Sequence, residues 1–126
     1  EVRLEGDLEA RLHRLCGKGY AEFRVAMARG AATPYPHRQH VLVFTRSKLH
    51  LKAGWSQVVT WEYCEHMTVC IDHWAKPHVL ISLDQLAAAD GSNAIRCSAI
   101  DVEDRDLLVM TLRYLVSMHC QQRARS

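Results

Sequence analysis

Cysteine and histidine side chains, the residue types that most often bind zinc, are concentrated in one stretch in the middle of the chain. The stretch contains Cys64, His66, Cys70, His73 and His78. Structural zinc sites favour two ligands on a tight knuckle of the C-x2-C kind, and this stretch has none. In an extended strand, alternation places His73 on the opposite face from the first three of these residues. The pattern therefore predicts no metal site, and instead a sheet surface that faces solvent or a partner.

A cysteine beside a histidine is also the arrangement of a thiol nucleophile and its base, and Cys64 or Cys70 near His66 fits that description. However, no glycine elbow positions a nucleophile here, and no paired carboxylates suited to acid–base catalysis occur elsewhere. The chain also lacks a glycine-rich loop that would cradle a phosphate. The sequence therefore predicts a protein that is not an enzyme and that uses no cofactor.

Basic side chains form the third group, and they are concentrated in the first half of the chain. Between positions 11 and 52 there are nine Lys and Arg residues and one acid, Glu22, so the net charge of this stretch is +8 (nine minus one). The basic residues are Arg11, Arg14, Lys18, Arg24, Arg29, Arg38, Arg46, Lys48 and Lys52. Such a stretch favours an anionic lipid headgroup, nucleic acid or an acidic protein as partner, although a basic solvated surface would have the same composition.

Length and composition set the class of protein. The chain has 126 residues, of which 48% are hydrophobic and 24% charged, as expected for a single globular domain over 1–126. No apolar run approaches the roughly 20 residues of a membrane-spanning helix, and no signal peptide is visible. Five cysteines without framework spacing indicate free thiols in a reducing compartment, the cytosol or the nucleus, and of these we expect a cytoplasmic protein. A start at Glu1 instead of Met favours a segment of a longer protein.

Seven segments have the composition or alternation of β-strands. In the first, Phe23 and Val25 lie on one face and charged residues on the other. The seven segments are 20–28, 41–45, 48–52, 58–63, 66–74, 78–83 and 94–100. Segment 30–39 contains two prolines and a glycine, which prevent regular pairing, and is expected to be a loop. Trp61 is expected in the core, and Trp55, after a glycine turn, on the surface.

Helical periodicity occurs at both ends of the chain. Segment 7–16 has leucines at helical spacing, and segment 102–120 begins with acids, which favour a helix N-terminus. The longer helix has one apolar stripe of Leu108, Leu112 and Leu115, and a second of Leu107, Met110, Tyr114 and Met118. One stripe is enough to cover a sheet, so a second element must cover the other. We expect the N-terminal helix to do so through Leu8, Leu12 and Leu15.

The order of these elements resembles the pleckstrin-homology-like superfold, in which a seven-stranded antiparallel barrel, here about 19–100, is closed by a C-terminal helix. The chain is most similar to the tail-homology-1 domain of class I myosins, which adds a helix before the barrel, and to GRAM-type domains. The similarity is carried by Phe23-Arg24-Val25, Arg29, and the run 38–51 with its leucine-rich strand, threonine, turn and Leu-x-Leu. The segments 67–71 and 106–116 follow in the expected order.

The resemblance implies a non-catalytic module that tethers a larger cytosolic or cytoskeletal protein to membranes with anionic lipids or phosphoinositides. The expected binding residues, at the first two strands and their loop, are Arg24, Arg29, Arg38, Arg46 and Lys48. The arginine fork suits bidentate phosphate contacts, whereas lysine adds a compact charge. Tyr35, between two prolines, is placed to insert at a lipid interface.

Two other partners compete with lipid. The same fold could bind protein or form a homodimer without binding lipid, for example by adding a peptide strand between the closing helix and an open strand edge. Nucleic acid is less favoured, because base stacking needs aromatic and basic residues on one sheet face. The middle strands instead carry Glu62, Glu65 and Asp72 among their aromatic residues.

Overall fold

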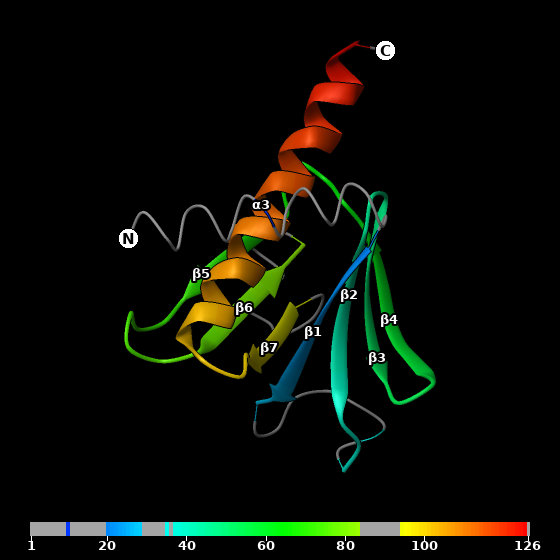
Figure 1. Cartoon of the computed structure of the whole chain (residues 1–126). Helices are drawn as coiled ribbons and strands as arrows, with labels where there is room; N and C mark the ends of the chain where they lie inside the picture. The colour runs from blue at the N-terminus through cyan, green and yellow to red at the C-terminus, as the bar shows by residue number, and fades with distance from the viewer. Residues whose placement is uncertain (1–9, 11–19, 29–34, 36, 84–93, 126) are drawn as a thin grey trace.

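A computed structural model of the chain describes residues 10, 20–28, 35, 37–83 and 94–125 (Figure 1). These residues form seven strands and one long helix. The elements are β1 (Tyr20–Met27), β2 (His40–Thr45), β3 (Lys48–Ala53), β4 (Ser56–Glu62), β5 (Thr68–Ile71), β6 (His78–Ser82), β7 (Ala94–Ser98) and α3 (Val102–Arg125). The predicted seven strands and C-terminal helix are confirmed. The predicted helix over 7–16 lies, apart from Ala10, outside the described residues.

The strands form one antiparallel sheet in the order β4-β3-β2-β1-β7-β6-β5. Its edge strands, β4 and β5, do not pair with each other within the described residues, so the sheet is open, whereas the sequence predicted a barrel that the C-terminal helix closes. The sheet also has a narrow seam in its middle. β1 pairs with β7 only at Ala26↔Ser98 and Met27↔Cys97. The two halves, β1–β4 and β5–β7, therefore diverge, and α3 packs against the space between them (Figure 1).

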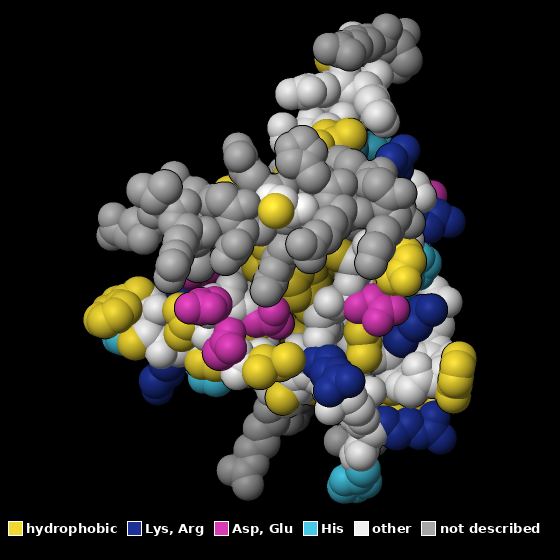
Figure 2. Space-filling model, in the orientation of Figure 1, with side chains coloured by type: hydrophobic (Ala, Val, Ile, Leu, Met, Phe, Trp, Pro, Cys, Tyr) yellow, Lys and Arg dark blue, Asp and Glu magenta, His cyan; other side chains and the backbone are white. Residues whose placement is uncertain are grey.

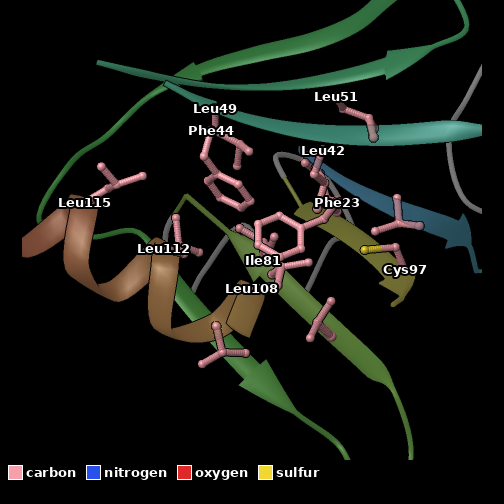
Figure 3. Close-up of a cluster of buried hydrophobic side chains, with 14 of the residues drawn as sticks. Phe23, Leu42, Phe44, Leu49, Leu51, Ile81, Cys97, Leu108, Leu112 and Leu115 are labelled. Atoms are coloured by element: carbon pink, nitrogen blue, oxygen red, sulfur yellow. The ribbon is translucent and has the colours of Figure 1, made fainter. Parts of the chain in front are cut away.

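The core lies between the two halves of the sheet and α3 (Figure 3). The rings of Phe23 and Phe44 meet edge to face, with centroids 5.6 Å apart and planes at 82°. From the helix, Leu108, Leu112 and Leu115 are all buried, as predicted. This stripe is what holds α3 on the sheet, because burial of each leucine contributes about 1.5–3 kcal/mol.

The second stripe of α3 is covered unevenly, and Met118 near its end is half-buried. Leu107 is buried, whereas Met110 and Tyr114 are exposed. The helix continues to Arg125, past the predicted end at position 120, and its last turns project beyond the sheet (Figure 1). In the described part of the chain, no helix combines the length and the apolarity needed to span a bilayer.

Candidate functional site

The outer face of the β1–β4 half carries most of the described basic strand residues, because the strand register lines up outward-facing side chains in rows. Arg24 of β1 is opposite Val41, which is opposite Lys52 of β3. One row further along the strands lies His50, and one row beyond that lies Lys48. Figure 2 shows most Lys and Arg side chains on the side of the molecule where β2–β4 lie, and most acidic side chains on the side of β6 and the start of α3.

Acidic residues are distributed unequally over the rows of this face. Glu22 lies in the row of His50, and Glu62 lies opposite Lys48. The row of Arg24 and Lys52 has no acid, and it lies next to the β3–β4 turn and the end of the β1–β2 connection. The positive potential is therefore strongest at this end, which we call the loop end. Among the described residues we define it by Arg24, Tyr35, Arg38, Lys52 and Trp55.

The loop end is held together by contacts between two connections that are distant in sequence. The guanidinium of Arg38 donates from Nη1 to Ser56 Oγ at 3.2 Å and lies 4.5 Å above the centre of the Tyr35 ring. The Gly54 backbone N–H donates to the Gln39 carbonyl at 3.2 Å. These contacts fix the arginine and the aromatic ring beside the tip of the β3–β4 hairpin.

Trp55 is fully exposed at the tip of that hairpin. The turn depends on Gly54, whose φ of +63° is a left-handed conformation that side chains other than glycine adopt with strain. The tryptophan therefore projects from a short, defined turn with basic side chains beside it. The expectation that Trp55 is exposed is confirmed.

The predicted binding residues do not all meet at the loop end. Arg24 and Arg38 lie there, and Arg29 lies outside the described residues. Arg46 and Lys48 lie at the β2–β3 turn, at the other end of β2. Since β2 has six residues, the separation is roughly 20 Å. A single headgroup cannot bridge that distance.

The β2–β3 turn has its own rigid support. The Thr45 hydroxyl accepts the Lys48 backbone N–H at 3.0 Å, and the buried Tyr63 hydroxyl lies 2.7 Å from the Thr45 carbonyl and 3.0 Å from the Lys48 carbonyl. Burial also raises the pKa of Tyr63. The hydroxyl is therefore kept protonated as a donor that fixes this turn.

His50 lies between the two lysines of β3, and its pKa depends on the charge of this face. Its Nδ1 atom lies 3.0 Å from Thr60 Oγ1 and 3.2 Å from Gln57 Nε2. Because an amide nitrogen only donates, Nδ1 accepts and the neutral ring keeps its proton on Nε2. Burial, followed by the charges of Lys52 and Lys48, lowers the pKa of His50 from its ordinary value of 6.5.

This geometry predicts the pH response of His50. Its pKa, measured by NMR titration of the ring, is expected to lie below 6.5 and to rise in Lys52→Met, which removes a like charge. The native state prefers the neutral ring, so the stability that His50 contributes is complete above the unfolded pKa and is lost as pH falls below it and through the lower pKa of the folded state. Lys76→Met, on the β5–β6 loop, is the matched control. A titration midpoint that is the same in Lys52→Met and the parent protein would contradict the assignment.

The Cys/His stretch is spread over separate contacts. Cys64 Sγ faces the Leu83 carbonyl at 3.9 Å, His66 pairs with Glu65 at 3.4 Å, and His73 lies beside Trp74. Cys70 is exposed on β5. In the described ranges, no three or more His, Cys, Asp or Glu side chains are grouped so that they could hold a metal ion.

Two surface hollows lie on the other half of the sheet. One, of about 410 Å³, lies on β6 and β7, where His78 Nδ1 is 2.5 Å from Ser98 Oγ and where Arg96 is accompanied by Asp72. Those opposite charges largely cancel the attraction for an anion. The other, of about 380 Å³, lies between edge strand β5 and α3 and is lined by Met67, Val69 and Arg113 among others. Among the described residues, the loop end is therefore the strongest candidate for binding an anion.

No family model matches the chain, and no curated protein matches it. The chemistry of its own surface is therefore the basis for assigning a function.

Proposed function

We propose that this chain is a non-catalytic, pleckstrin-homology-like module that attaches a larger cytosolic or cytoskeletal protein to membranes rich in anionic lipid, including phosphoinositides. The loop end would face the bilayer. The order of seven antiparallel strands followed by a helix supports the proposed architecture.

The observation that carries the proposal is the fully exposed Trp55 at the β3–β4 tip, next to Ser56, which Arg38 contacts, and close in sequence to Lys52. An indole ring favours the headgroup region of a bilayer, where its apolar body is buried and its N–H stays hydrated. Each basic side chain near an anionic leaflet adds about 1 kcal/mol. In water, by contrast, a fully exposed tryptophan buries none of its apolar ring and so contributes no favourable free energy.

Vesicle sedimentation tests this proposal. The intact chain is expected to bind phosphatidylcholine vesicles that contain phosphatidylserine, and to bind less as salt screens the attraction. Phosphoinositide-containing vesicles of equal charge test whether one headgroup is preferred. Trp55→Ser and Lys52→Ala are each expected to weaken binding about fivefold, the factor that corresponds to about 1 kcal/mol.

Matched controls come from the opposite side of the molecule. Trp74→Ser removes another exposed tryptophan, and Arg113→Ala removes an exposed arginine of α3. Both variants are expected to bind vesicles like the parent chain. If Trp55→Ser and Trp74→Ser lose binding equally, or if the parent chain does not bind at low salt, the proposal fails.

A second candidate, protein binding without lipid binding, is favoured by the groove between β5 and α3. β5 is an edge strand, so its outer backbone groups can pair with an added strand. Arg113 at the groove favours an extended, apolar peptide that carries a carboxylate. Val116→Glu, which introduces a charge into the groove, would block such a peptide but leave vesicle binding intact.

A further inference from the structure

Arg105 is the most deeply buried Lys or Arg side chain of the described residues. Its hydrogen bonds all go to the β5–β6 loop and to Asp106. Only 5% of the residue is exposed. Its Nη1 atom donates to the carbonyls of His73 at 3.1 Å, Trp74 at 2.9 Å and Lys76 at 2.6 Å. Its Nε and Nη2 atoms donate to Asp106 Oδ1 at 3.0 and 2.7 Å. A buried guanidinium is tolerated only with such partners, so the β5–β6 loop is fixed to the first turn of α3.

The loop is stiffened by its own backbone as well. The Lys76 N–H donates to the His73 carbonyl at 3.1 Å, and the Ala75 N–H donates to His73 Nδ1 at 3.0 Å. At the far end of the loop, the Ala99 N–H donates to the Pro77 carbonyl at 2.9 Å. The loop therefore has one defined conformation, although it projects from the sheet.

This rigid loop presents a large apolar ring to solvent. Trp74 is 79% exposed, and its ring lies against that of His73, with centroids 5.7 Å apart and planes at 23°. Ile71, at the end of β5, and Ile100, next to the bonded Ala99, are also exposed. An aromatic ring held in place before binding is the usual anchor of a protein interface, because little conformational entropy is lost when it is covered.

The charges around Trp74 are opposite in sign to those around Trp55. Asp72 is in the same loop. Asp101 and Glu103 are exposed at the start of α3, which Arg105 joins to this loop through its hydrogen bond to the His73 carbonyl. The cations on this side are Lys76 in the loop and Arg96, which lines the same hollow as Asp72. Figure 2 shows most of the visible acidic side chains on this side of the molecule. An anionic membrane would repel this surface, whereas a basic partner would be attracted to it.

We propose that the surface formed by Ile71, Asp72, Trp74, Ile100, Asp101 and Glu103, the Trp74 surface, docks a basic segment of a protein partner. An arginine or lysine of the segment would lie over the Trp74 ring as a cation–π pair and beside the carboxylates. An apolar side chain of the segment would cover the isoleucines. The surface lies on the opposite side of the molecule from the β3–β4 tip (Figure 1), so this docking is independent of membrane attachment.

Peptide display tests the proposal on the intact chain. Random short peptides on phage are selected against the chain, and the enriched peptides are synthesised and measured by calorimetry. The enriched peptides are expected to carry net positive charge and at least one large apolar residue. Trp74→Ala is expected to weaken their binding by about tenfold or more. Asp72→Asn with Glu103→Gln is expected to weaken binding less and to reduce its salt dependence.

Trp55→Ala is the matched control and is expected to leave peptide affinity unchanged. Circular dichroism of each variant checks that the fold is retained, and the charge variants, which alter exposed side chains, provide a second route if Trp74→Ala is poorly folded. The proposal is overturned if no peptide is enriched, if the enriched peptides are neutral or acidic, or if folded Trp74→Ala binds them as the parent chain does.

Discussion

Substitution of Leu112 by alanine is expected to lower the free energy of unfolding by about 2–5 kcal/mol, the usual cost of removing a buried leucine side chain. Leu112 is 2% exposed and belongs to the central stripe of α3, beside Leu108 and Leu115 (Figure 3). The residue lies where the helix meets the two diverging halves of the sheet, so the cavity has little room to collapse. Urea unfolding should show a lower midpoint with an unchanged slope.

Met110 provides the control on the same helix. It is 43% exposed, so Met110→Ala is expected to change the stability by no more than about 0.5 kcal/mol. Equal losses in Leu112→Ala and Met110→Ala would show that the stripe is not the part of α3 that covers the core.

Arg105→Ala is expected to lower the free energy of unfolding by roughly 2–4 kcal/mol, because three loop carbonyls and a carboxylate lose a buried donor and, among the described residues, only the His73 carbonyl keeps another, the Lys76 N–H. The lost contacts are those to His73, Trp74 and Lys76 and to Asp106. The loss of stability should appear first in the β5–β6 loop. Backbone amides of the β5–β6 loop should exchange faster with solvent than those of β1–β4.

Arg113→Ala, at an exposed position of the same helix, removes the same type of side chain without a buried contact. Its expected effect on stability is small, within about 0.5 kcal/mol. If the two arginine variants were equally stable, the hydrogen bonds of Arg105 would contribute nothing to holding the loop.

The strand and helix assignments succeeded where one face of an element is buried. Phe23 and Val25 on β1, and the three leucines of α3, lie inside as their spacing predicts. β5 is shorter than predicted, 68–71 instead of 66–74. The alternation continues through 72–74, but the carbonyls there bond to Arg105 instead of to a neighbouring strand. A contact from a helix about thirty positions away cannot be inferred from local periodicity.

The end of α3 shows the limit of reasoning from apolar stripes. The stripe stops near position 120, whereas the helix continues to Arg125. The last residues, Gln121 to Arg125, are polar but include good helix formers, so their backbone bonds persist without a face to bury.

The candidate site was predictable in part. The basic character of the first half and the exposure of Trp55 follow from composition and from the glycine turn before it. The distance between Arg46 and Arg38 could also have been predicted, because the two residues are at opposite ends of one predicted strand. What the sequence does not contain is the contact of Arg38 with Ser56, which joins two connections 18 positions apart and brings Lys52 and Trp55 into the site.

The seam between the two halves of the sheet has a consequence for how the chain acquires its structure. Every other strand pairing joins strands that are consecutive along the chain, whereas the β1–β7 pairing joins Met27 to Cys97. Closing that one long loop costs more entropy than closing any of the other connections. The hairpins of each half can therefore form early, and their joining at Ala26 and Met27 should limit the folding rate. Substitutions that weaken the seam should then slow folding more than equally destabilising changes within the β2–β3 hairpin.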